Sequence, residues 1–299
     1  MKTLIGLGCS HTQGCAFVSR HPFPGPQAKE YMYKEGNDYL HELASDELKK
    51  HYGTTHITTG WLTDNLTWMG KLNKFLKYDT ILNFGLGGMG IEANIRTMRN
   101  FIFQKRDLSD CLIIHQLPAV QRTELVGKKK DGEWCVTNRI LWNEELGKEN
   151  LMESILNFNK DYHANKFIWD IYYLQELIES KGGEYRCFGF DWNNNQSEPS
   201  YPIDIKGRID EIQEFTSLQH NDEIHYEQYK PTDIKDVLNS INWLHLSNRN
   251  PKPKLHDVKL LNYDFHFTEE GNETIAKDIY DGLQIYKLQQ EYKLQQELK

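Results

Sequence analysis

The chain has 299 residues, of which 38% are hydrophobic and 12% aromatic, and this is enough material for a sizeable core. Its net charge of −8 disfavours nucleic acid as a partner, and its mean hydropathy of −0.69 with no long apolar run predicts no transmembrane helix. Five cysteines without C-x-x-C spacing predict reduced thiols, and the N-terminus lacks the pattern of a signal peptide. We therefore expect a cytoplasmic location, with a virion or a signal-less export route as alternatives.

The first half of the chain alternates between expected strands and expected helices. Short apolar runs that end at glycine or proline predict buried strands, and apolar residues at helical spacing predict helices. The strands are expected at residues 3–7, 80–84 and 111–117, and the helices at 62–76 and 91–103. Such an alternation is typical of a parallel sheet with right-handed crossover connections, which defines an α/β fold.

The second half of the chain adds elements to this sheet and contains long polar segments. A charged hairpin is expected with its tip at 128–132, then a helix at 165–181, a strand at 184–190 and a closing helix at 270–286. Residues 191–255 are polar, aromatic and punctuated by Asn and Pro, so we expect them to lead away from the sheet.

This pattern predicts a single domain over residues 1–285, with insertions at about 123–165 and 191–255, followed by a helical extension at 286–299. The extension contains a direct repeat of the six residues Tyr-Lys-Leu-Gln-Gln-Glu. Because a period of six does not match the heptad of a coiled coil, we expect a solvated helix. Self-association through this helix is the alternative.

The first segment that could carry chemistry follows the first strand and reads Gly8-Cys9-Ser10-His11-Thr12-Gln13-Gly14. Open parallel sheets bind ligands outside the carboxyl ends of their strands, so Ser10 is a candidate nucleophile and His11 a candidate pocket residue. Capping of the next helix by Ser10 is an equally good interpretation of this segment alone. The spacing fits neither an α/β-hydrolase nucleophile elbow nor a P-loop.

The second segment is the glycine cluster that follows the second strand. Gly85, Gly87 and Gly90 match the dinucleotide pattern G-x-G-x-x-G, but the nearest acids, Asp107 and Asp110, precede the third strand instead of following it. The alternative is that these glycines bring backbone N–H groups to a developing oxyanion.

The third segment is the pair Asp264 and His266, just before the closing helix. An imidazole base needs a carboxylate that fixes its tautomer, and Asp264 is close enough in sequence to supply it. Capping of the closing helix by Thr268 is the structural alternative. The serine, the glycines and the Asp/His pair are all expected at one edge of one sheet.

This ordered set of segments resembles the SGNH hydrolases, also called GDSL-like esterases. The matching residues are Gly8, Ser10, Thr12 and Gly14 in the first block, Asn83, Gly85 and Gly88 in the second, and Asp264 and His266 in the last. Cys9 stands where the family has Asp, and the last pair has one residue fewer between its members than the commonest form. The resemblance implies a three-layer α/β/α sandwich with a flavodoxin-like parallel sheet, and a serine esterase that uses no cofactor and no metal.

The block after the third strand departs from the family, which places Gly-x-Asn-Asp there and uses the Asn as an oxyanion donor. By resemblance, the N–H groups of Ser10 and Gly88 are the other donors, and either Gln116 or Gln121 replaces the missing Asn. Loss of one such donor typically costs ~10²–10³ in turnover. Arg122 is a candidate for holding a charged substrate group, with a structural ion pair as the alternative.

The resemblance implies hydrolysis of small acyl esters, for example O-acetyl groups on carbohydrate. The alternative is a non-catalytic carbohydrate-binding or structural module on the same fold. Trp192 and Trp243 are candidates for stacking on a sugar, although core positions are their default. His220 and Asp222 have the spacing of part of a 2-His-1-carboxylate iron site, which is a weaker alternative because their segment reads as a loop.

Overall fold

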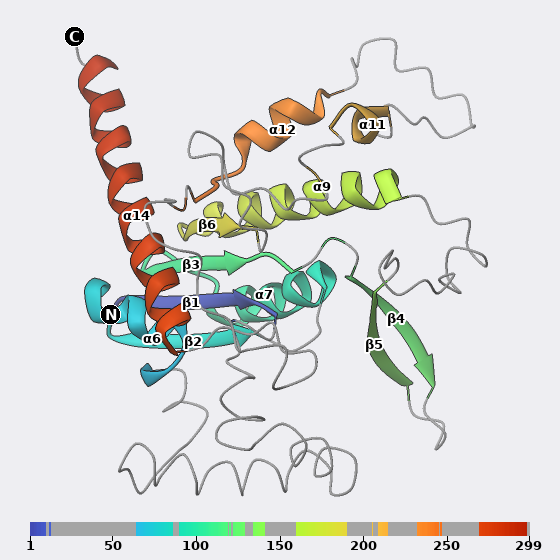
Figure 1. Cartoon of the computed structure of the whole chain (residues 1–299), viewed down its shortest axis with the longest axis horizontal. Coiled ribbons are helices and arrows are strands. Elements are labelled where there is room, and N and C mark those ends of the chain that lie inside the picture. Colours follow the sequence, from blue (N-terminus) through green and yellow to red (C-terminus); the bar gives the residue numbers. More distant parts are fainter. Residues whose placement is uncertain are drawn as a thin grey trace, which may run out of the picture. The chain divides into compact units, whose positions relative to one another are not determined.

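A computed structural model shows strands and helices that alternate along the chain (Figure 1). The described residues are 1–9, 12, 64–85, 90–118, 120, 122–128, 134–140, 160–189, 205, 209–214, 232–244, 246 and 269–297. Four strands form a sheet in the order β2-β1-β3-β6, which is the order of the first four strands in flavodoxin-like folds. The predicted α/β fold class with a parallel sheet is therefore confirmed.

The described chain divides into two compact units. Unit 1 comprises Met1–Gly87, Asn194–Glu198 and Leu244–Lys299, and unit 2 comprises Gly88–Asn193 and Pro199–Trp243. The elements of unit 1 are β1 (Thr3–Gly8), α6 (Trp68–Leu76), β2 (Thr80–Gly85) and α14 (Glu269–Glu297). The elements of unit 2 are α7 (Ile91–Lys105), β3 (Cys111–Gln116), β4 (Arg122–Lys128), β5 (Trp134–Ile140), α9 (Lys160–Glu179), β6 (Glu184–Phe188), α11 (Ile209–Glu214) and α12 (Ile234–Ser240).

In unit 1, β1 and β2 are parallel, with Thr3 opposite Thr80 and Gly8 opposite Gly85. Every residue of β1 is buried, as expected for a continuous apolar strand that is covered on both faces. Helix α6 packs on both strands, and Met69 in its first turn lies where a side chain on Gly6 would project. A larger residue at position 6 would therefore require the Met69 side chain to move.

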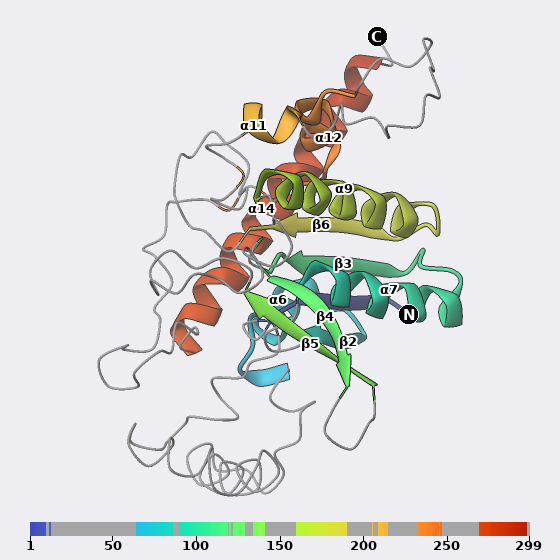
Figure 2. The same cartoon turned by 90° about the vertical axis from the view of Figure 1, so that its right-hand side faces the viewer.

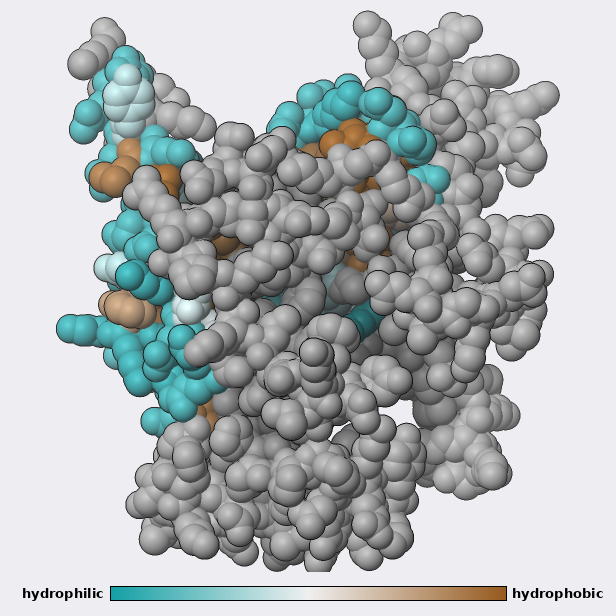
Figure 3. Space-filling model, viewed as in Figure 1, coloured by the Kyte–Doolittle hydropathy of each residue, from teal (hydrophilic) through white to brown (hydrophobic). Residues whose placement is uncertain are grey.

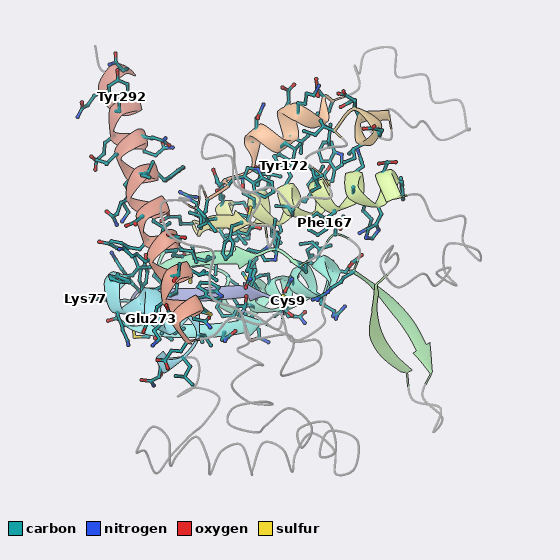
Figure 4. All side chains as sticks on the ribbon, viewed as in Figure 1. Cys9, Lys77, Phe167, Tyr172, Glu273 and Tyr292 are labelled. Atoms are coloured by element: carbon teal, nitrogen blue, oxygen red, sulfur yellow. The ribbon has the colours of Figure 1, made fainter. Side chains whose placement is uncertain are left out.

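Helix α14 packs on α6 through its N-terminal half, where Figure 4 shows Glu273 on the part of α14 beside α6. Its buried apolar residues are Ile275, Ala276, Ile279 and Leu283. The C-terminal half of the helix exposes Leu288 and Tyr292, and Figure 3 shows a largely hydrophilic surface along α14 with isolated hydrophobic patches. One helix thus spans both the expected closing helix and the expected extension. Self-association through it stays a prediction.

In unit 2, β3 and β6 are parallel, and α9 lies along β6 in both views (Figures 1 and 2). Helix α9 also contacts α7, α11 and α12. Strands β4 and β5 form the expected antiparallel hairpin. Gly182, at a φ of 81°, follows α9 and permits the left-handed turn that leads into β6.

Three details differ from the expectations. Helix α6 begins at Trp68 and not at residue 62, whereas α9 begins at Lys160, five residues before the expected start, with Asp161 in its first turn. Trp243 is 6% exposed, and its indole N–H donates to the Leu238 carbonyl, so its interpretation as a sugar-stacking residue is wrong. Among the described helices, none is long and apolar enough to cross a membrane.

Candidate active site

Strand β1 ends at Gly8. Its φ of 151° lies in a region that residues with a side chain rarely adopt, which accounts for a glycine at this position. Cys9 follows and is 3% exposed, so its side chain packs inward (Figure 4). The next two residues, Ser10 and His11, lie outside the described part of the chain.

Thr12 and Asn83 join the two glycine-containing segments of unit 1. The Asn83 amide donates from Nδ2 to the Thr12 carbonyl oxygen at 2.8 Å, although the two residues are 71 positions apart. Its Oδ1 accepts from the Gly85 N–H at 2.9 Å. Thr12 is fully buried, and its Oγ1 donates to the Leu7 carbonyl at 3.3 Å. Thr12 is therefore held to β1 and also to the end of β2.

The start of α14 is anchored to the start of α6. Asn272 is 2% exposed, and its Oδ1 accepts from the Trp68 backbone N–H at 2.8 Å. Lys71 donates from Nζ to Glu269 at 2.6 Å and to Glu273 at 2.9 Å. Asp264 and His266, which precede this helix, lie outside the described residues.

In unit 2 the end of β3 is fully buried: Gln116 is 0% exposed and lies opposite Phe188 of β6. Arg122 begins β4 and is partly exposed. A side chain on Gly90 would place its Cβ 2.7 Å from the Arg122 carbonyl oxygen, so the glycine lets the backbone of Arg122 pack against the start of α7. The role of Gln116 as an oxyanion donor and the role of Arg122 in holding a substrate stay predictions.

A polar cluster lies beside Arg122 and joins α7 to α9, with His163 buried and Lys166 partly exposed. The His163 side chain is 6% exposed and hydrogen-bonds with the backbone of Val120 and of Arg122. Burial lowers the pKa of His163 overall, although the negative charge of Glu92 and these hydrogen bonds oppose the shift. The imidazole is therefore neutral at pH 7. Lys166 donates to Asp170 at 2.6 Å and lies 3.5 Å from Glu92.

A second histidine of unit 2, His115 in β3, is fully buried. Its Nδ1 lies 2.8 Å from the hydroxyl of Tyr185. Burial lowers the pKa of His115 to about 3, and it raises the pKa of the Tyr185 phenol. Both side chains are therefore uncharged at pH 7, and His115 is a core residue of the sheet.

Most of the candidate residues fall outside the described part of the chain. These are Ser10, His11, Gly88, Gln121, Asp264 and His266, whereas Gln116 and Arg122 are described. Asp107 and Asp110 precede β3 as expected, and Asp110 pairs with Lys105 at 2.6 Å. Within the described residues no group of His, Cys, Asp or Glu side chains could hold a metal ion. His220 and Asp222 lie outside them.

Sequence reasoning missed Lys71, His163 and the contact made by Asn272. Each of these residues is polar within a helix, where a polar side chain predicts a solvated face. A usable signal is the position of Asn272, three residues before Ile275 on the apolar face of α14. A polar side chain on such a face is buried and needs a partner.

No family model matches this chain, and no curated protein matches it. Among solved structures, the chain is similar to a candidate lipolytic protein of the G-D-S-L family from Desulfitobacterium hafniense DCB-2. The two chains share 10% identity with a TM-score of 0.39, over 94% of this chain and 99% of the other.

Proposed function

We propose that this protein is a serine esterase. Ser10 attacks the acyl carbonyl, and His266, oriented by Asp264, takes the hydroxyl proton and gives it to the leaving alcohol. The N–H groups of Ser10 and Gly88 stabilise the oxyanion, and water then hydrolyses the acyl-enzyme with His266 as the base. Small acyl esters, such as O-acetyl groups on carbohydrate, are the proposed substrates.

The hydrogen bond between Asn83 and the Thr12 carbonyl is the observation that carries this proposal. It joins the two segments that the sequence blocks select independently, and Gly8 and Gly85 face each other in the register of β1 and β2. A helix cap at Ser10 alone would not require this link from β2. A nucleophile benefits from it, because a catalytic group must keep a fixed geometry.

The anchored start of α14 gives further support. His266 precedes Glu269 by three residues, and three residues span at most about 11 Å. Glu269 is bonded to Lys71 in the first turn of α6, the helix that leads into β2. The general base is therefore close in sequence to a fixed point of unit 1, the unit that also contains Ser10.

A fluorophosphonate probe tests the proposal, because it reacts covalently with an activated serine. We expect the full-length protein to be labelled, and Ser10→Ala to lose both labelling and ester turnover. Ser109→Ala is the matched control, since Ser109 is exposed and lies in unit 2. A folded wild-type protein that is neither labelled nor active on acetyl esters contradicts the esterase and leaves the non-catalytic module.

A further inference from the structure

A groove of about 420 Å³ lies between the C-terminal halves of α7 and α9 in unit 2. The two helices run in the same direction, because Glu92 and Lys166 approach each other to 3.5 Å near the N-terminal ends. Pockets for small molecules typically have volumes of about 300–1,000 Å³, so the groove is large enough for a small ligand.

The floor of this groove is apolar. It is formed by Ile102 of α7 and Leu177 of α9, and Phe103 lies beside them with 78% of its surface exposed. Tyr173, one turn before Leu177 on α9, is also exposed. One exposed aromatic residue is ordinary on a protein surface, but an apolar strip in a groove is a place where an alkyl chain can leave water.

The other residues that line the groove are exposed cations, namely Arg99, Arg106 and Lys181. Within the described residues none of the three side chains forms an ion pair. The acids nearest to them in sequence on α7 have other partners, since Asp107 accepts from the Ser109 N–H at 2.9 Å and Asp110 pairs with Lys105 at 2.6 Å. The described lining is therefore positive, although the chain as a whole has a net charge of −8.

Helix dipoles account for only part of this charge pattern. A cation at the C-terminal end of a helix is stabilised by the dipole, which explains Arg106 and Lys181, because they follow α7 and α9 closely. Arg99 lies about two turns before Arg106, beyond the reach of this effect. The spacing of three and four residues places Arg99 on the same face of α7 as Ile102 and Phe103.

We propose that this groove binds a small amphiphile with a carboxylate head group. Its alkyl chain lies on the apolar floor, and its carboxylate is held by the guanidinium groups of Arg99 and Arg106, which match a carboxylate in bidentate geometry. An anionic membrane is a poorer partner, because the net charge of −8 repels an extended anionic surface. A single small anion instead responds to the charges within a Debye length of about 8 Å.

The position of the groove makes this inference independent of the proposed esterase. Arg106 and Lys181 lie just before β3 and β6, so the groove is at the amino ends of these strands. Open parallel sheets bind the ligands of their reactions at the carboxyl ends. The amphiphile is therefore a second ligand and not the ester that is hydrolysed.

Isothermal titration calorimetry of the full-length protein with octanoate tests this proposal. We expect octanoate to bind at least ~10-fold more tightly than acetate, which lacks the alkyl chain, and than octyltrimethylammonium, which reverses the charge of the head group. Because the cations are exposed, we also expect higher salt to weaken the binding of octanoate.

Two substitutions separate the charged part of the groove from its apolar part. Arg99→Gln and Phe103→Ser each weaken octanoate binding by ~5–10-fold, and both keep the wild-type melting temperature because the two side chains are exposed. Lys287→Gln, on the exposed part of α14, is the matched control and leaves the affinity unchanged. Fluorophosphonate labelling is unchanged in all three variants, which keeps this test separate from that of the esterase.

Octanoate that does not bind, or that binds equally to all variants and no better than the cationic amphiphile, overturns the proposal. Binding to phosphatidylglycerol vesicles that is lost in Arg99→Gln, without binding of octanoate, also overturns it and assigns the groove to a lipid surface.

Discussion

The two units stabilise their strand ends in different ways. In unit 1, Asn83 of β2 donates to the carbonyl of Thr12, which follows β1, and accepts from Gly85 within β2. In unit 2 the last residue of β3, Gln116, is fully buried. The polar contacts of this unit lie around His163 and Lys166 of α9.

The difference shows that hydrogen bonds at a strand end and polar contacts between helices have different tasks. A hydrogen-bonded loop can hold a side chain at a defined place without burying it, which suits a nucleophile. The polar cluster between the helices instead holds backbone in place, as the buried His163 does for Arg122. His163 is uncharged and Lys166 is paired, because an unpaired charge next to a protein interior is costly. We therefore expect substitutions at the Asn83 contacts to change activity and stability together, and substitutions around His163 and Lys166 to change stability alone.

Asn83→Ala provides the largest expected effect on activity. It removes the hydrogen bonds to the Thr12 carbonyl and the Gly85 N–H, and at about 1 kcal/mol each the free energy of unfolding falls by about 2 kcal/mol. Because Thr12, two residues after the proposed nucleophile, loses its link to β2, we also expect the labelling rate to fall by ~10²-fold. Urea unfolding and probe kinetics measure the two effects.

Asn165→Ala is the control from unit 2. Asn165 is buried in α9 and donates to the Ile212 carbonyl at 3.1 Å, so its loss destabilises the protein by about 1 kcal/mol. We expect unchanged labelling. If Asn83→Ala is also labelled at the wild-type rate, the hydrogen bond has only a structural role and the comparison between the units fails.

The bounds of the parallel strands could be predicted from the sequence to within two residues, because short continuous apolar runs such as that of β1 are typical of strands covered on both faces. The order of the candidate motifs along the chain could also be read from the sequence. The start of α6 was not, since its capping group is Asn272, far away in the chain. Lys71 and His163 were also missed, because a polar helical residue predicts solvent unless the packing of a second helix is known.

His115 provides the second prediction, a dependence of stability on pH. Its pKa is about 3 in the folded protein and ordinarily about 6.5, so below pH 6.5 the unfolded chain binds one proton more than the folded chain. Its contribution is complete above pH 6.5 and falls by about 1.4 kcal/mol for each pH unit between 6.5 and 3. We expect His115→Gln to flatten this slope in urea unfolding measured from pH 7 to pH 4. An unchanged slope contradicts the burial of a neutral imidazole.

The smallest expected effect comes from Lys166, which resembles Lys71 because each lysine contacts two carboxylates. The Lys166 side chain is 43% exposed and that of Lys71 is 7% exposed. Water screens the exposed lysine, so we expect Lys166→Met to change the free energy of unfolding by less than about 0.5 kcal/mol. Lys71→Met costs about 1–2 kcal/mol, because it leaves two carboxylates without their buried partner although both reach solvent. Urea unfolding at low and high salt measures both variants. If both substitutions change the free energy of unfolding by the same amount, burial does not distinguish the two lysines. The contacts of Lys71 with Glu269 and Glu273 then contribute no more than a surface ion pair.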